Sequence, residues 1–348
     1  MDYSRVLALP EFEAIAAGSV EATSFDYIAG GAWSELSLGE NEAAWHRWRL
    51  RPRVLVDISG VEPATTLLGM PAAFPAAIAP MAFHGLANPA AESATARAAA
   101  TAGVPFTLST MSTHSIEEVA NAAPDGTRWF QLYTQADPGR SRSLVERATA
   151  AGYRAIVLTV DLPILGYRER DRRNGFDVGA VPLGNFADGP PSRGADGPSL
   201  TWADLDEIRS WSSLPLVVKG ILTAEDARLA VEHGIDAIVV SNHGARQLDR
   251  VAAPIDVLEE IVDAVGKRSE IWVDGGVRRG LDIAIAIALG ARGVLVGRPM
   301  LWALAAGGQA GVERGLAILR EEFEIALALL GAPTVAALGR GHVDRSPR

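Results

Sequence analysis

Short apolar runs alternate with amphipathic helical patterns along most of the chain. From about residue 75 onward, eight apolar runs are separated by stretches with helical periodicity, and they lie at residues 74–79, 104–108, 129–132, 155–158, 216–218, 237–240, 271–273 and 293–296. This alternation is typical of βαβ units around a parallel sheet. Because eight such strands fit a closed barrel, the pattern predicts an α/β fold of the (β/α)8 TIM-barrel class.

The starts of the helical stretches support this division. Ser115, Thr201 and Thr223 each precede an acidic residue three positions later, which is the approximate signature of a capping box. The longest helical stretch, about residues 309–330, is expected to close the chain. Barrels of this class can exceed 250 residues as one domain, so we expect a single domain over residues 1–348.

Two segments fall outside the repeat. The N-terminal extension, residues 1–70, holds two helical stretches and an Arg-rich piece, WHRWRLRPRVLVD, and could cap the bottom of the barrel or lean over its mouth. Residues 177–199, after the fourth strand, are rich in Gly and Pro. They resemble a short, mobile lid loop, although an idle surface insertion would have the same composition.

Composition and charge exclude several classes of function. A net charge of -10 and a pI near 5.2 disfavour a nucleic acid or a membrane surface as partner, so we expect a small molecule. No run approaches the roughly 18 apolar residues of a membrane span, and the opening residues lack a signal pattern, so we expect a cytoplasmic protein. The chain has no cysteine, so redox chemistry would need a bound cofactor. The six histidines lack metal-site spacing, so no metal is expected.

Polar residues gather where the predicted strands end, which in a barrel is where the chemistry is built. Taken singly, each could be an ordinary loop residue. Together they place a lysine, a histidine and two aspartates around one rim, and Lys219 is one of only two lysines among 32 cationic residues. The strand ends are Ser109-Thr110, Gln131 to Tyr133, Thr159 to Asp161, Lys219-Gly220, Ser241 to His243, Asp274 to Gly276 and Gly297-Arg298.

The last two strand ends predict a phosphate site. Asp274-Gly-Gly-Val-Arg278 and Gly297-Arg298 combine glycine amides, which can approach an anion closely, with guanidinium groups that bind phosphate. Phosphate sites in barrels typically follow strands seven and eight. Glycines that merely turn the chain would give the same local sequence.

The segment SNHGARQLD places His243 three residues before Arg246. An imidazole there can act as a general base near neutral pH, and an arginine can hold a carboxylate. A lone histidine would more often be structural, but the neighbouring polar strand ends favour the functional interpretation.

Several motifs resemble one known family in order and in spacing. They are FDYIAGGA around Tyr27, FQLY at 130–133, LTVD at 158–161, GYRERDRRNGF at 166–176, VVKGILTAEDA at 217–227, SNHGARQLD at 241–249, WVDGGVRRG at 272–280 and VGRP at 296–299. From about Glu11 to Leu338 the chain resembles the FMN-dependent L-2-hydroxy acid oxidases and dehydrogenases, among them glycolate oxidase, lactate oxidase and mandelate dehydrogenase.

The resemblance implies catalytic roles for residues of the rim. His243 would take a proton from the substrate while a hydride passes to flavin N5, and Asp161 would pair with the imidazolium that forms. Lys219 would lie beside flavin N1, where an ammonium stabilises the negative charge of the reduced flavin. The substrate carboxylate and oxygens would be bound by two arginines and two tyrosines, namely Arg168, Arg246, Tyr27 and Tyr133.

The resemblance also implies FMN as the cofactor and assigns its binding residues. The flavin ring would be packed or hydrogen-bonded by residues of five strand ends, namely Pro80, Met81, Ala82, Ser109, Gln131, Thr159 and Ser241. The ribityl chain and the phosphate would be bound by Asp274, Gly276, Arg278, Gly297 and Arg298. Met111 stands where glycolate-oxidase-like members often have an aromatic residue bordering the substrate, which permits a larger or more apolar substrate side chain.

Some alternatives stay open at this level. The reduced flavin could return its electrons to oxygen, giving hydrogen peroxide, or to a quinone or carrier protein, and we favour oxygen because neither a haem domain nor a membrane segment is evident. A flavin-free barrel isomerase would share the phosphate site, and a catalytically inactive flavin-binding protein would share the rim. The resemblance further implies a homo-oligomer, either a tetramer or an octamer.

Overall fold

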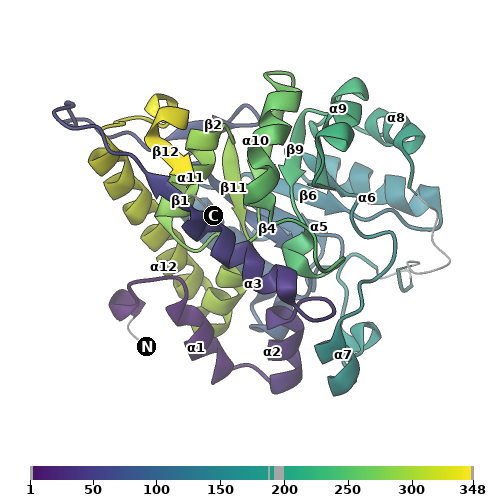
Figure 1. Cartoon of the computed structure of the whole chain (residues 1–348). Helices are drawn as coiled ribbons and strands as arrows, with labels where there is room; N and C mark the ends of the chain where they lie inside the picture. The colour runs from purple at the N-terminus through teal and green to yellow at the C-terminus, as the bar shows by residue number, and fades with distance from the viewer. Residues whose placement is uncertain (1–2, 187–188, 192–199, 346–348) are drawn as a thin grey trace.

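The computed structural model describes residues 3–186, 189–191 and 200–345 (Figure 1). Within these residues a closed parallel barrel has the strand order β10-β11-β4-β5-β6-β7-β8-β9. The strands coincide with the eight apolar runs to within a few residues, which confirms the predicted TIM barrel. They are β4 (Ala76–Met81), β5 (Phe106–Ser109), β6 (Arg128–Leu132), β7 (Ile156–Thr159), β8 (Leu216–Ile221), β9 (Ala237–Val240), β10 (Glu270–Val273) and β11 (Gly293–Val296).

Helices surround the barrel, and two of the three predicted capping boxes are present. Ser115 and Thr201 each form a complete box, whereas Thr223 caps its helix by accepting a hydrogen bond from the N–H of Asp226. The helices of the βα repeat are α4 (Ala91–Ala102), α5 (Ile116–Ala122), α6 (Pro138–Ala150), α8 (Trp202–Ser210), α9 (Ala224–Glu232), α10 (Pro254–Val265), α11 (Gly280–Leu289) and α12 (Arg298–Leu330).

Helix α12 is longer than the pattern predicts. It starts directly after β11, and the non-helical residues Gly307 and Gly308 divide it into two parts. The predicted helix at 309–330 is the second part. The first part was missed because it follows the last strand without a loop and is almost entirely buried, so it lacks the polar face that marks a surface helix.

The N-terminal extension contains three α-helices rather than the two predicted: α1 (Glu11–Ala17), α2 (Ala22–Ala29) and α3 (Leu36–Ala43). Helix α3 was missed because its sequence, LSLGENEA, has a central glycine and a weak apolar pattern. Its Asn41 exchanges two amide hydrogen bonds with Asn242, which lies just after β9. The extension therefore reaches the carboxyl ends of the strands and covers the mouth of the barrel.

Another part of the extension closes the opposite end of the barrel. Strands β2 (Thr65–Leu67) and β3 (Met70–Ala72) form an antiparallel hairpin just before β4. Leu67 is fully buried in one cluster with Trp129 and Trp272, whose rings meet edge to face at 5.2 Å. Strand β1 (Trp48–Leu50) pairs with β12 (Val343–Arg345), so the N-terminal extension is joined to the C-terminal segment (Figure 1).

The structure describes only part of the segment 177–199, for which a lid is predicted. Residues 187–188 and 192–199 lie outside the described residues. Before them, Asn185 is buried and bonds to the N–H of Ile116, the carbonyl of Thr110 and the hydroxyl of Ser112. This part of the segment is therefore tied to the loop after β5. Helix α7 (Glu169–Asn174) precedes it.

Within the described ranges, no helix combines the length and the apolar character that crossing a bilayer requires. The same residues contain no cluster of three or more His, Asp or Glu side chains that could hold a metal ion.

The hairpin that closes the barrel gives a test of the core. Replacing buried Leu67 with Ala should lower the free energy of unfolding by about 2–5 kcal/mol, because the barrel interior would be left with a cavity. Leu7 is 70% exposed, so Leu7→Ala should change it by less than about 0.5 kcal/mol. Denaturant titration measures both, and equal effects would show that Leu67 does not fill the barrel.

Candidate active site

A cavity of about 630 Å³ opens at the carboxyl ends of the barrel strands. Its volume lies in the usual range for a ligand pocket. Most of the residues singled out from the sequence line it: Tyr27, Pro80, Met81, Ala82, Ser109, Met111, Tyr133, Arg168, Lys219, His243, Arg246, Asp274, Gly276, Arg278, Gly297 and Arg298. The other four are not among its lining residues, and they are Gln131, Thr159, Asp161 and Ser241.

His243 and Asp161 form the central pair of the site. The Nδ1 atom of His243 lies 2.8 Å from Oδ1 of Asp161, and its Nε2 atom lies 3.3 Å from the hydroxyl oxygen of Tyr133. An ionised carboxylate only accepts hydrogen bonds, so the imidazole donates through Nδ1. Nε2 is therefore left as the acceptor that faces the cavity.

The backbone around His243 is held in an unusual conformation. His243 and Ala245 have φ values of 59° and 61°, in the left-handed region that L-residues rarely adopt. The side chain of Asn242 accepts from the N–H of Ala245, while the hydroxyl of Ser241 accepts from the N–H of His243. These side chains fix the turn, and helix α3 fixes Asn242 through Asn41.

A glycine makes room for Asp161. Gly220 has a φ of 117°, and a Cβ atom there would lie 2.6 Å from both Cβ and Cγ of Asp161. The glycine that follows Lys219 therefore lets the carboxylate approach the strand end, which explains the Lys-Gly sequence at this position.

The protonation states of the pair follow from their surroundings. Burial lowers the pKa of His243, the charges of Lys219 and Arg168 lower it further, and Asp161 opposes both effects. Burial would raise the pKa of Asp161, but the charge and hydrogen bond of His243 hold that pKa below its ordinary value. At neutral pH the pair is therefore a neutral imidazole beside a carboxylate, which is the form that can accept a proton.

Lys219 is buried at the end of β8 with two polar partners. Its Nζ atom lies 2.9 Å from the hydroxyl oxygen of Ser241 and 3.2 Å from Oδ2 of Asp274. Burial alone would lower the pKa of Lys219, but the charges of Asp274 and Asp161 raise it above its usual value. The cavity wall thus carries a permanent ammonium group.

Two arginines of the site share one acceptor. Arg246 donates to the carbonyl oxygens of Tyr27 and Gly30, at 2.6 and 2.9 Å. Arg298 donates to the carbonyl oxygens of Ile28 and Gly30, at 2.9 and 2.7 Å. The carboxyl end of helix α2 therefore holds both guanidinium groups, as expected from the partial negative charge of a helix C-terminus.

These cations also repel each other. Burial, together with the charges of Arg246 and Arg278, lowers the pKa of Arg298 to about 9. Burial lowers the pKa of Arg168 to about 10, with Arg246 as the next cause. A cavity with this charge favours anionic groups such as a phosphate or a carboxylate.

Arg278, in the loop after β10, lines the same cavity. Its guanidinium pairs with Glu42 of helix α3, and its N–H donates to the carboxylate of Asp282. Gly276 lies two residues earlier with a φ of 81°, and a Cβ atom there would come 1.8 Å from the carbonyl oxygen of Asn41. Position 276 in the loop after β10 therefore requires glycine, because helix α3 packs directly against the backbone there.

Unpaired polar atoms show that the cavity fits FMN. Nε2 of Gln131 and Oδ1 of Asp274 are buried without a hydrogen-bond partner among the described residues. Buried polar groups are normally paired, so these two atoms point to a polar ligand. Together with Lys219 and the arginines, they provide donors and acceptors for a polar ring, a hydroxylated chain and a phosphate.

Some residues of the site were not singled out from the sequence. Asn41 and Asn242 fix the His243 turn, and Gln247 donates to the carbonyl oxygens of Asp161 and Ile164. Phe176 stacks on Tyr27 with ring centroids 4.4 Å apart. Asn242, Gln247 and Phe176 lie within the quoted motifs and could have been found there, whereas Asn41 lies in a segment without a clear pattern.

Known proteins resemble this chain over nearly its whole length. Residues 16–345 match the protein family described as FMN-dependent dehydrogenase. An L-lactate oxidase from Nostoc sp. is 49% identical, with 94% of this chain and 95% of the relative covered. A glycolate oxidase from Spinacia oleracea is 45% identical, with 96% and 94% covered. The structure of mandelate oxidase with (S)-4-hydroxymandelic acid has a TM-score of 0.93 and 43% identity, with 98% of this chain and 100% of that chain covered.

The His243–Asp161 pair can be tested by titration. Asp161→Asn keeps a hydrogen-bond acceptor but removes the charge that stabilises the imidazolium, so the pKa of His243 should fall. NMR titration of the histidine rings measures this shift. Asp206→Asn removes a carboxylate beside the distant His233 and should leave the pKa of His243 unchanged. A rise in the pKa of His243 in Asp161→Asn would contradict the assigned pair.

Proposed function

The chain belongs to the family of FMN-dependent dehydrogenases, and from this premise we propose that it oxidises an (S)-2-hydroxy acid to the 2-oxo acid with oxygen as the electron acceptor. Its function as an FMN-dependent oxidoreductase of 2-hydroxy acids follows from that family and from its named relatives. The single observation that carries the reaction is the neutral His243, paired with Asp161 and facing a cavity rich in guanidinium groups.

His243 acts as the general base in this proposal. Its Nε2 atom takes the proton of the substrate's 2-hydroxyl group, and Asp161 stabilises the imidazolium that forms. The hydroxyl of Tyr133, next to Nε2, donates to the substrate oxygen and keeps it beside the base. When bound, FMN supplies a two-electron acceptor whose reduced form oxygen can reoxidise with release of hydrogen peroxide.

Arg168 and Arg246 hold the substrate carboxylate. Both line the cavity, and Arg246 packs over the Tyr27 ring at 4.7 Å. Tyr27 also lines the cavity, and its hydroxyl would be a further donor to the carboxylate. The charges of two buried guanidinium groups favour a carboxylate over a neutral ester, because charge-assisted hydrogen bonds are the stronger ones.

FMN would be held by the cationic and unpaired polar groups of the cavity. Arg278, Arg298 and the amide of Gly297 would bind its phosphate, and Asp274 would bind the ribityl hydroxyls through its unpaired oxygen. Ser109, Gln131 and Lys219 would contact the polar edge of the ring. Thr159 would hydrogen-bond the ring as well, and Ser241, whose hydroxyl accepts from Lys219, would orient that lysine. The segment 80–82 lines the cavity and would pack on the ring.

The substrate side chain is proposed to be apolar and larger than that of glycolate. One part of the cavity is lined by apolar side chains, which are Met111, Leu162, Ile164, Leu165, Val181, Leu183 and Phe186. Apolar walls favour an apolar group over a hydroxyl or a hydrogen. The (S) configuration is supported by the similar mandelate oxidase, which was solved with (S)-4-hydroxymandelic acid.

Oxygen is proposed as the acceptor because the named relatives are oxidases. A quinone or a carrier protein is the competing acceptor, and the experiment below separates them. The flavin-free isomerase considered from the sequence is wrong, because the chain belongs to an FMN-dependent family. The cytoplasmic location and the homo-oligomeric state, a tetramer or an octamer, stay predictions that cell fractionation and sedimentation can test.

Anaerobic bleaching tests the reaction and its acceptor. Mixing the FMN-loaded protein with 2-hydroxy acids should bleach the flavin with (S)-mandelate and (S)-2-hydroxy acids of long alkyl chain faster than with glycolate. Admission of air should restore the colour and release peroxide. Slow recovery in air with rapid recovery on adding a quinone would instead identify a dehydrogenase.

Substrate analogues serve as controls for the carboxylate site. Methyl esters should bleach the flavin poorly, because Arg168 and Arg246 would lose their charged partner. Equal rates with the ester and the acid would remove the two arginines from this role, and rapid bleaching by (R) enantiomers would contradict the proposed stereochemistry.

Two variants separate catalysis from cofactor binding. His243→Gln cannot accept the proton, so flavin reduction should slow by at least ~10²-fold while FMN stays bound. Arg298→Ala should weaken FMN binding by about 1.5–3 kcal/mol, the value of a hydrogen bond to a charged group, yet protein re-saturated with FMN should regain most of its reduction rate. Stopped-flow bleaching and FMN titration measure both, and parental bleaching by His243→Gln would overturn the assigned base.

A further inference from the structure

We propose that Arg170 is a positioning residue that fixes three anion-binding arginines, Arg168, Arg246 and Arg298, by attaching helix α7 to the end of helix α2. The proposal rests on the roles given to Arg168, Arg246 and Arg298 in the proposed function. Arg170 itself is absent from the residues that line the described cavity, so it acts through the backbone that carries those arginines.

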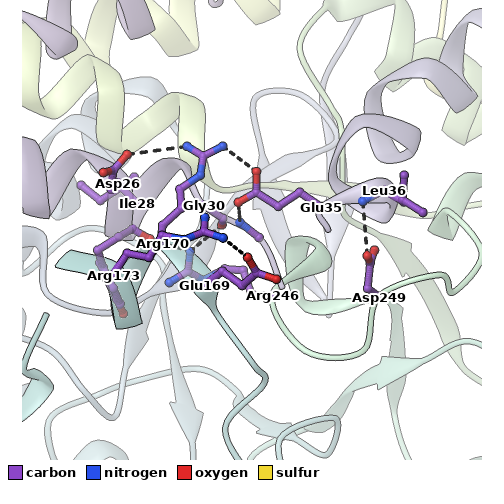
Figure 2. A network of polar contacts seen from close by, with 12 residues as sticks. Asp26, Ile28, Gly30, Glu35, Leu36, Glu169, Arg170, Arg173, Arg246 and Asp249 are labelled. Atoms are coloured by element: carbon purple, nitrogen blue, oxygen red, sulfur yellow. Dashed lines mark hydrogen bonds and ion pairs between the residues drawn. The ribbon is translucent and has the colours of Figure 1, made fainter. Parts of the chain in front are cut away.

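Arg170 lies between two carboxylates of the N-terminal extension (Figure 2). Its guanidinium reaches Oε2 of Glu35 at 2.5 Å and Oδ1 of Asp26 at 3.7 Å. Asn174, at the other end of α7, donates to Oδ2 of Asp26 at 2.5 Å. Helix α7 is thus attached to α2 at both of its ends.

The carboxyl end of α2, which Arg170 attaches to α7, is also the part that binds Arg246 and Arg298. Glu35 uses its second oxygen, Oε1, to accept from the N–H of Gly31 at 2.9 Å. The neighbouring carbonyl of Gly30 accepts from both Arg246 and Arg298 (Figure 2 shows the contact with Arg246). One carboxylate therefore connects Arg170 to the backbone that sets both guanidinium groups.

The start of α7 carries the third of these arginines, Arg168. Arg168 directly precedes α7, and its Nε atom donates to the carbonyl oxygen of Arg246 at 3.2 Å. A shift of α7 away from α2 would therefore move Arg168 relative to Arg246. It would also disturb the stack of Phe176 on Tyr27.

A fastening of this kind is needed because the three arginines repel each other. The pKa of Arg168 and that of Arg298 are both lowered by burial and by the charge of Arg246. Repulsion favours separation of the elements that carry them. Arg170 is itself a cation, but it is paired with Asp26 and Glu35, so these three residues together add no net positive charge.

The experiment compares Arg170→Gln with Arg173→Gln. Arg173 lies on the same helix and pairs with Glu169 of that helix, so its variant removes the same charge without releasing α2 (Figure 2). Three quantities are measured: kcat and KM for the best 2-hydroxy acid, the dissociation constant of oxalate from FMN-loaded protein, and the dissociation constant of FMN.

Arg170→Gln should raise KM and the two dissociation constants about fivefold, the equivalent of ~1 kcal/mol for a partly exposed ion pair, with kcat within about twofold of the parent. Arg170→Glu should raise them further, because it would face Asp26 and Glu35, whereas Arg170→Lys should restore much of the parental affinity. Arg173→Gln should match the parent in all three quantities.

Three outcomes would overturn the proposal. They are a lower melting temperature in Arg170→Gln with unchanged affinities, equal losses in Arg173→Gln, and a loss confined to kcat. If no 2-hydroxy acid bleaches the parent protein, the proposed function fails, but oxalate and FMN titrations still decide whether Arg170 positions the arginines.

Discussion

The site depends on keeping several cations buried together without neutralising them. A buried guanidinium group needs hydrogen-bond acceptors, but a carboxylate partner would cancel the charge that a ligand anion requires. Backbone carbonyls at the end of helix α2 solve this problem, because they satisfy Arg246 and Arg298 while leaving the charge in place. The N-terminal extension is therefore part of the active site as much as the barrel is.

Two carboxylates accompany the groups whose charge state matters to the proposed reaction. Asp161 faces His243, which must gain and lose a proton, and Asp274 faces Lys219, which burial would otherwise tend to neutralise. Ser241 connects the two pairs, because its hydroxyl accepts from Nζ of Lys219 and from the N–H of His243. A base and a permanent cation are thus held in fixed relation by one buried serine.

Sequence patterns predict the barrel and its polar rim because both follow from local rules. Each strand is an apolar run, and each functional residue such as Lys219 or Asp274 stands at the end of one. The role of the extension could not be predicted in this way. Helix α3 has a weak pattern of its own, and the contacts of Asn41 and Glu35 join residues far apart in the chain. The carbonyl partners of Arg298 carry no sequence signal, since any residue has a carbonyl.

The same cations connect substrate binding to the strength of the base. Burial lowers the pKa of His243, and the charges of Lys219 and Arg168 lower it further, which keeps the imidazole neutral but also makes it a weaker base. A substrate carboxylate held by Arg168 and Arg246, as proposed, would place a negative charge in the same cavity and offset that effect. In the proposed reaction His243 would therefore become more basic when an acid is bound. An ester or amide carries no such charge, so it would bind poorly and would also leave His243 a weak base.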